Sequence, residues 1–195
     1  MNHLRIIFFI IVMGIYLWFP AQLIRSNEIV LAEGYTCDMS LQPIDPYDAF
    51  RGRYIILSYD ATASLGVDTV AYGIPLYVTL KSDSLGYCAF DKAYPSPPEA
   101  PYIRVPSYGG LNYDRVWLQL PQDMKRFYLN EEIAPLAEEA FRELQRTRRE
   151  MGTTEVTAFA RLKVLDGKVR VEQVYFEGQP VAEYVRERFL SSSKQ

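Results

Sequence analysis

The chain has little of the chemistry that most catalytic sites use. Its 195 residues include one histidine and two cysteines. The one histidine is His3, so residues 4–195 contain no histidine. This excludes Ser–His and Cys–His mechanisms and removes the commonest ligand of zinc and copper. The sequence also has no phosphate-binding loop and no dinucleotide-binding fingerprint. We therefore expect no catalytic residues, no metal and no cofactor, and we do not expect an enzyme.

Positive charge is also scarce. The chain has 21 Lys and Arg against 24 Asp and Glu, a formal net charge of −3 at pH 7. Nucleic-acid-binding domains carry clustered basic residues, and the sequence has no polybasic run. We therefore expect no nucleic-acid partner. Aromatic residues are plentiful instead, with 15 Tyr and 10 Phe, which favours sheet-rich structure.

One long uncharged run is the clearest signal in the chain. It extends from Ile6 to Ile24, 19 residues without a charged side chain. As a helix it would be about 28 Å long, close to the hydrocarbon thickness of a bilayer. Arg5 precedes the run, and two acids, Glu28 and Glu33, lie soon after it. This weak positive bias indicates an N-terminus inside the cell and an exported remainder.

A cleaved signal peptide is the alternative for this segment. The apolar run is long for that role, and Phe19-Pro20-Ala21 puts a large ring where cleavage needs a small residue. We predict a retained anchor over residues 1–27, which crosses the cell (inner) membrane once. Residues 28–190 would then form an extracytoplasmic domain, and residues 191–195 a flexible tail.

Alternating apolar and polar residues predict short strands through most of the domain. We expect strands at 35–41, 53–59, 76–81, 87–94, 103–105, 115–120, 156–164 and 169–176. Asp166-Gly167, between the last two, is a strong hairpin signal. An apolar stripe from Ile133 to Met151 predicts one long helix, and a short closing helix is expected at 181–189. The predicted fold is α+β, a curved mainly antiparallel sheet or open barrel with one long helix, preceded by an N-terminal transmembrane helix.

Two states are open to the cysteines, Cys37 and Cys88. In an oxidising compartment they can form a disulfide across a loop of about fifty residues. Cys37 lies on the apolar face of its predicted strand, so two buried thiols are the alternative.

The sequence leaves two kinds of hydrolytic site open. Asp45 and Asp48 are three residues apart and would share one side of a helical turn. Such a pair acts as acid and base when burial separates the two pKa values. Aspartates before a turn more often cap backbone N–H groups, and we favour capping here. A Ser–Lys pair is the second possibility, although the sequence sets no particular pair apart.

The stretch that follows these aspartates resembles a family signature. Residues 52–59 read Gly-Arg-Tyr-Ile-Ile-Leu-Ser-Tyr. This stretch is similar to the signature of the GDYXXLXY family, with matches at Gly52, Tyr54, Leu57 and Tyr59. Arg53 stands where the family has aspartate.

Flanking residues extend the resemblance. The family's Pro-hydrophobic-Asp-Pro-x-Asp-hydrophobic-hydrophobic-Arg run is matched by Pro43, Ile44, Asp45, Pro46, Asp48, Ala49, Phe50 and Arg51. Arg126, in the run Arg126-Phe127-Tyr128, resembles an Arg-Tyr-Phe element ahead of the long helix. An N-terminal membrane segment is also typical of the family.

The resemblance implies a membrane-anchored or exported protein without an assigned activity, often beside or fused to a multi-pass membrane protein. An integral membrane protein is therefore the expected partner, and an accessory or interaction role the expected function. Arg53 carries the opposite charge to aspartate and has no acceptor atom, so it cannot act as an acid or a metal ligand. We therefore expect the signature to have a structural or interaction role. A cell-envelope hydrolase using carboxylates or a Ser–Lys pair, and a glycan or small-molecule binder using exposed tyrosines, are the alternatives.

Overall fold

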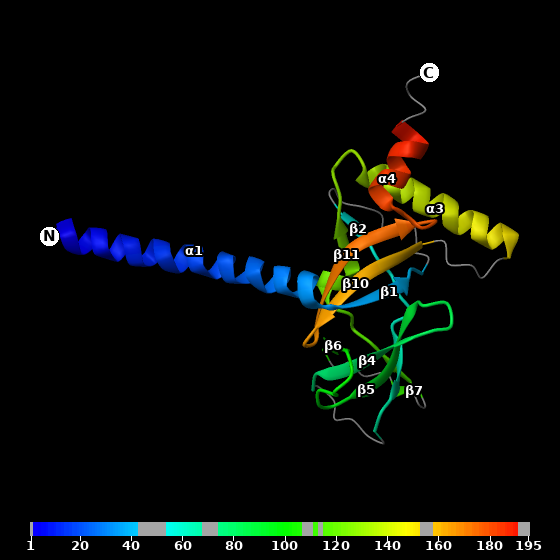
Figure 1. The fold of residues 1–195 in the computed structure, drawn as a ribbon, viewed down its shortest axis with the longest axis horizontal. Helices are drawn as coiled ribbons and strands as arrows, with labels where there is room; N and C mark the ends of the chain where they lie inside the picture. The colour runs from blue at the N-terminus through cyan, green and yellow to red at the C-terminus, as the bar shows by residue number, and fades with distance from the viewer. Residues whose placement is uncertain are drawn as a thin grey trace.

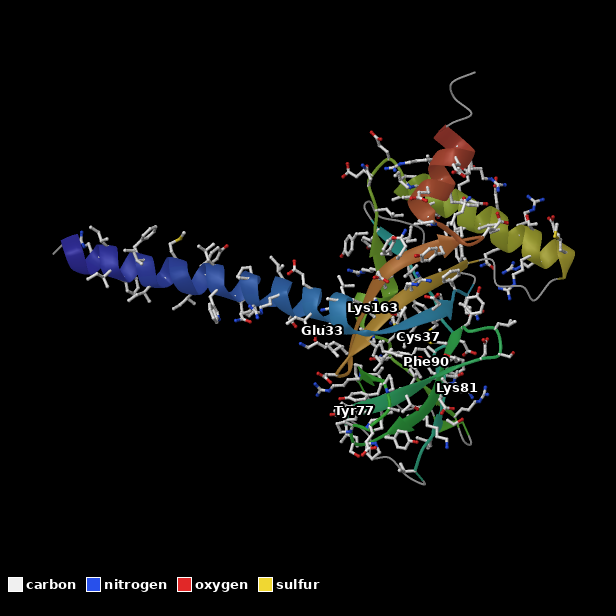
Figure 2. The ribbon with its side chains drawn as sticks, in the orientation of Figure 1. Glu33, Cys37, Tyr77, Lys81, Phe90 and Lys163 are labelled. Carbon is white, nitrogen blue, oxygen red and sulfur yellow. A yellow bond between two sulfur atoms is a disulfide. The ribbon has the colours of Figure 1, made fainter. Side chains whose placement is uncertain are left out.

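A long helix and a sheet domain make up the chain (Figure 1). The computed structural model describes residues 2–42, 54–67, 74–106, 111–112, 115–152 and 158–190. Helix α1 (Asn2–Glu33) extends away from the domain, and Figure 2 shows its side chains projecting on all sides. Phe8, Trp18 and Phe19, for example, are each at least 67% exposed. A helix that is apolar all round is typical of a membrane span, and α1 is long and apolar enough to be one.

Helix α1 continues without a break into the domain. The predicted anchor boundary at residue 27 falls inside it, and Val30, one turn before its end, is buried. The N–H of Gly34 donates to the carbonyl of Val30 at 3.0 Å, and strand β1 begins at the next residue. A Cβ atom at Gly34 would overlap the Val30 carbonyl oxygen and lie 3.0 Å from the backbone nitrogen of Val164. Glycine is therefore the residue that fits this corner.

Ten of the described strands form one sheet, in the order β12-β11-β10-β1-β5-β3-β8-β7, with β4 paired to β5 and β6 paired to β4. Their bounds are β1 (Tyr35–Ser40), β3 (Thr62–Leu65), β4 (Leu76–Ser82), β5 (Cys88–Tyr94), β6 (Tyr102–Val105), β7 (Leu111–Asn112), β8 (Arg115–Trp117), β10 (Ala158–Leu165), β11 (Lys168–Phe176) and β12 (Gln179–Pro180). Strand pairs are antiparallel except β1–β5 and β3–β5. The sheet is not closed into a barrel, so the predicted α+β fold with a mainly antiparallel sheet is confirmed in its open form.

The sheet has a seam at β5. One edge of β5 pairs with β4, whereas the other edge is shared by β1 and β3. Strand β1 meets β5 at one residue pair, Met39 with Cys88, and β3 meets it at Ser64–Lys92 and Leu65–Ala93. A single hydrophobic core nevertheless continues across this seam.

The β10–β11 hairpin forms as the sequence predicts. Asp166 and Gly167 have φ angles of 48° and 78°, the paired positive values of a tight primed turn. The carbonyl of Gly167 accepts a hydrogen bond from the backbone N–H of Arg104 at 2.9 Å. The hairpin turn therefore also contacts β6, at the edge of the sheet beyond β4.

Two C-terminal helices lie near β10 and β11 (Figure 1). Helix α3 (Ala134–Met151) contributes Phe141, whose ring stacks on Phe176 of β11 at 5.5 Å. Helix α4 (Val181–Val185), which continues as a π-helical turn over Arg186–Leu190, packs Tyr184 edge-on against the same ring. Both predicted helices are confirmed. The predicted apolar stripe was wrong at its end, because Met151 is 74% exposed in the last turn.

A separate two-stranded sheet lies beside the main one. It pairs β2 (Tyr54–Ile56) with β9 (Arg126–Tyr128), which directly follows the short helix α2 (Gln122–Lys125). Sequence reasoning predicted β2 within a longer strand and missed α2, β3, β7, β9 and β12. Each of these is at most four residues long, too short for a periodic pattern.

Candidate functional site

The signature strand β2 and the Arg-Phe-Tyr strand β9 lie side by side. Tyr54 pairs with Tyr128 in register, and their rings are 5.6 Å apart. The guanidinium carbon of Arg126 lies 5.0 Å from the centre of the Tyr54 ring, within range of a cation–π contact. Two elements that the resemblance singled out, far apart in sequence, therefore contact one another.

The second half of the signature is buried against the same segment. Leu57 and Tyr59 are 4% and 6% exposed. The Leu57 N–H donates to the carbonyl of Lys125 at 2.8 Å, and the Tyr59 hydroxyl donates to the carbonyl of Met124 at 3.0 Å. Burial raises the pKa of the Tyr59 phenol well above its ordinary value. Tyr59 is therefore a neutral hydrogen-bond donor inside the fold, with no access to a substrate.

Other predicted site residues lie outside the described residues. These are Asp45, Pro46, Asp48, Arg51, Gly52 and Arg53. The roles proposed for the two aspartates, acid–base pair or cap, therefore stay predictions. Across the ranges that the structure does describe, no group of three or more His, Cys, Asp or Glu side chains could hold a metal ion.

The cysteines form a disulfide at the seam. Cys37 of β1 is bonded to Cys88 of β5, with Cα atoms 5.7 Å apart and 51 residues between them in sequence. Both side chains are buried. Of the two states that the sequence left open, the structure has the disulfide. It joins the two strands where their backbone pairing is limited to one residue pair.

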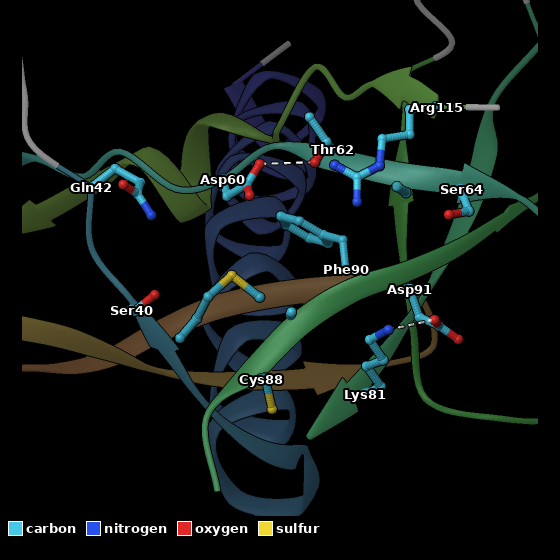
Figure 3. A pocket seen from close by; sticks show the side chains of 13 residues that line it. Ser40, Gln42, Asp60, Thr62, Ser64, Lys81, Cys88, Phe90, Asp91 and Arg115 are labelled. Carbon is cyan, nitrogen blue, oxygen red and sulfur yellow. Dashed lines mark hydrogen bonds and ion pairs between the residues drawn. The ribbon is translucent and has the colours of Figure 1, made fainter. Parts of the chain in front are cut away.

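A cavity of about 290 Å³ opens beside this disulfide, where β1 and β3 diverge along the edge of β5 (Figure 3). Phe90 lies between Asp60 on one side and the Lys81–Asp91 pair on the other. The Lys81 ammonium is 3.3 Å from the Asp91 carboxylate, and Asp60 accepts a hydrogen bond from Thr62 at 2.8 Å. The remaining polar lining comes from Ser40, Gln42, Ser64 and Arg115.

This cavity can hold a small polar molecule, but its charged groups are not arranged for a Ser–Lys reaction. Lys81 contacts a carboxylate, and no serine of the described ranges donates to it or accepts from it. Of the cavity residues, the sequence analysis singled out only Cys88 as a candidate site residue. They come from five strands and their flanking turns, so no local motif could have identified them.

A second cavity, of about 220 Å³, lies where α1 meets the β10–β11 hairpin. Its lining includes Arg25 and Ser26 from the helix and Asp166 and Lys168 from the hairpin. Lys168 Nζ donates to Ser26 Oγ at 2.8 Å. Next to it, Arg170 donates to Asn27 Oδ1 at 3.0 Å from Nε and at 2.6 Å from Nη2.

A comparison with known protein families identifies a family for this chain. The sequence model of the family described as GDYXXLXY protein matches residues 16–174, from within α1 to within β11. Among curated proteins and among solved structures, none matches the chain.

Proposed function

The chain belongs to the GDYXXLXY family, and from that premise we propose a single-pass accessory protein of the cell membrane. Its sheet domain lies outside the cytoplasm, and its partner is a multi-pass membrane protein. The proposal rests first on α1, whose exposed apolar surface needs a lipid or protein environment. Because the helix continues directly into β1, the domain stays next to the membrane.

The disulfide is the observation that carries the orientation. Disulfides persist in oxidising compartments and are rare in the cytosol, where thiols are kept reduced. The Cys37–Cys88 bond lies in the domain that α1 carries, so it supports a domain on the exported side. The positive bias at the start of α1, with Arg5 before the uncharged run, supports the same orientation.

The described part of the signature supports an interaction role over a catalytic one. Leu57 and Tyr59 are buried, and Tyr54 packs on Arg126 and Tyr128 of β9. These residues hold one segment of the domain against another. They therefore stabilise the domain, and Tyr54, the signature side chain in β2, is engaged in these contacts.

Photo-crosslinking tests the partnership. A photoreactive amino acid replaces Leu17, which is 61% exposed in α1, in the full chain expressed in its native membrane. The expected product is a crosslink to a multi-pass membrane protein, which also co-purifies in mild detergent. Leu85, 76% exposed in the β4–β5 turn, is the matched position far from the helix. Purification of the chain alone, without a crosslink from either position, contradicts the proposal.

A reporter fusion tests the orientation. A periplasmic-type phosphatase, which folds only after export, is fused behind Gln195, and a cytoplasmic fluorescent protein is fused at the same place as the control. We expect phosphatase activity and no fluorescence, because the domain follows α1 out of the cytoplasm. The reverse pattern would reject the proposed orientation.

One contact favours a second candidate, a Ser–Lys hydrolase. Ser26 and Lys168 are hydrogen bonded at 2.8 Å beside a cavity. However, such enzymes need a lysine kept neutral by burial, and Lys168 is exposed. A fluorophosphonate probe distinguishes the candidates, because it bonds covalently to activated serines. We expect no labelling of the wild type; labelling that the Ser26→Ala variant loses would establish the hydrolase instead.

A further inference from the structure

The β10–β11 hairpin lies at the level where α1 leaves the membrane. Ile24 ends the uncharged run, and Ser26 and Asn27 follow it two and three residues later. With the rise of an α-helix, these residues lie about 3 and 4.5 Å beyond Ile24. The headgroup layer on each side of a bilayer is about 5–8 Å deep. Given the proposed membrane span, on which this inference rests, both residues lie within that layer.

Hydrogen bonds fix two basic side chains of the hairpin at the same level. Lys168 donates to Ser26, and Arg170 donates to Asn27 through two of its nitrogen atoms. Arg170 also donates to the Asp123 carboxylate at 2.6 Å, so its charge is already matched. Lys168 has three N–H donors, and Ser26 takes one of them.

The cavity between α1 and the hairpin combines a charged rim with an apolar wall. Arg25 and Lys168 provide two positive charges, and Asp166 provides one negative charge. The wall is made by Ile29, Val30 and Leu165. The phosphate oxygens of a phospholipid bind cationic donors, and the glycerol carbons of the same lipid favour apolar contacts. This lining offers both, with one net positive charge.

We propose that this cavity binds the headgroup phosphodiester of one phospholipid, with Arg25 and Lys168 as the cationic contacts. The bound lipid completes a three-way junction of helix, hairpin and bilayer. It fixes how the domain is turned relative to the membrane. The site joins residues from opposite ends of the chain, which is why the sequence shows no basic cluster.

Native mass spectrometry of the full chain tests the proposal. The protein is released from nanodiscs that contain equal amounts of phosphatidylglycerol and phosphatidylcholine, and the retained phospholipids are counted. We expect one retained phospholipid per chain, with phosphatidylglycerol preferred because the lining has a net positive charge. Arg25→Gln and Lys168→Gln should each weaken retention about fivefold, the effect of about 1 kcal/mol per cation at a membrane surface.

Two further variants sharpen the test. Asp166→Asn removes the only carboxylate among the described residues that line the cavity. It keeps the turn, since Asn-Gly is a preferred pair in such hairpins. It should strengthen retention about fivefold. A control pair, Lys92→Gln with Arg149→Gln, removes two exposed charges on β5 and α3. It should leave retention unchanged.

Three outcomes overturn the inference. The first is that the wild type retains no phospholipid. The second is that the Arg25→Gln/Lys168→Gln variant retains as much phospholipid as the wild type. The third is that inorganic phosphate alone displaces the lipid, which indicates a site for free anions. A cooperative denaturant-unfolding transition, followed by circular dichroism, shows that each variant has folded. Extraction of the chain by alkaline carbonate contradicts the membrane anchor itself, so that failure is distinct from failure of lipid binding.

Discussion

Two parts of the domain are held together in different ways. The helical part comprises β1, β10, β11 and β12 with α3 and α4, and the all-strand part comprises β3 to β8. In the helical part, β1 pairs with β10 along its whole length, and every residue of β10 pairs with β11 across one bulge. The all-strand part meets β1 at a single residue pair and touches the hairpin turn at Gly167.

Helix α1 is fixed to the helical part. Its contacts are with β10 and β11, through Ser26, Asn27 and the buried Val30. The all-strand part is therefore connected to α1 through the seam and the hairpin turn. The disulfide lies between β1 and β5, where backbone pairing is limited to one residue pair. It therefore secures the all-strand part rather than the whole domain.

Removal of the disulfide should have the largest effect on how the two parts are held together. In the Cys37→Ala/Cys88→Ala variant, the denatured chain is no longer closed into a loop of 51 residues. The free energy of unfolding should fall by about 4 kcal/mol in the loop-entropy account. Denaturant unfolding of the full chain in detergent micelles, followed by circular dichroism, measures this.

Amide hydrogen exchange locates the effect of the same variant. Protection should fall mainly in β3 to β8, while β10 and β11 keep most of theirs. Wild-type protein treated with a reducing agent is the matched control and should behave like the variant. An equal loss of protection in both parts would contradict the special role of the seam.

Replacement of Gly34 should disturb the other connection, between α1 and the helical part. An added Cβ overlaps the Val30 carbonyl and crowds the backbone of β10, so Gly34→Ala should destabilise by about 3 kcal/mol. Gly14→Ala in the same helix is the control, because nothing lies within 4 Å of the new atom. The same unfolding measurement applies. Equal stability of the two variants would show that the corner can relax.

Much of this two-part fold could be predicted from the sequence, because long elements carry their own pattern. Strand β10 alternates regularly before the Asp166-Gly167 turn, and α3 carries an apolar stripe and is followed by Gly152. The stripe failed at Met151, since the end of a helix can extend past the sheet that it covers. Very short strands such as β3 and β9 were missed because three or four residues cannot show a period.

The sites were much less predictable than the fold. The family signature led to Tyr54, Leu57, Tyr59 and Arg126, which the structure brings to one corner. The two cavities instead depend on which strands lie side by side. Pairing between segments more than a hundred residues apart is decided by the whole sheet, so residues such as Lys168 had no local signal.

The buried signature tyrosine offers a pH-dependent test of its contact with α2. Tyr59→Phe removes the hydrogen bond to the Met124 carbonyl and should cost about 1 kcal/mol at pH 8. Burial raises the pKa of Tyr59, so the folded chain keeps this proton while the unfolded chain loses it above about pH 10. Stability from Tyr59 is therefore fully present below pH 10 and is lost as the pH rises further.

Phenylalanine has no such proton, so the stability difference between wild type and Tyr59→Phe should shrink above pH 10. The linkage slope is about 1.4 kcal/mol per pH unit for one proton. Urea unfolding of both proteins at several values between pH 8 and pH 11 measures it. A difference that stays constant over this range would mean that the phenol is exposed to solvent.

One ion pair on each side of the seam gives the finest comparison. In the helical part, Arg161 Nε and Nη2 donate to the two Asp38 oxygens at 2.8 Å each, and these bonds raise the pKa of the Arg161 guanidinium. In the all-strand part, Lys81 approaches Asp91 at 3.3 Å with a side chain that is 63% exposed. Bidentate, half-buried pairs couple more strongly than exposed single contacts.

Double-mutant cycles should therefore give about 1 kcal/mol for Asp38–Arg161 and about 0.3 kcal/mol for Lys81–Asp91. Neutral replacements, Asp to Asn and Arg or Lys to Gln, keep the side chains similar in size. The weaker pair should lose its coupling in high salt, since exposed charges are screened. Equal couplings would mean that electrostatics does not distinguish the two parts, and the contrast between them would then rest on strand pairing and the disulfide alone.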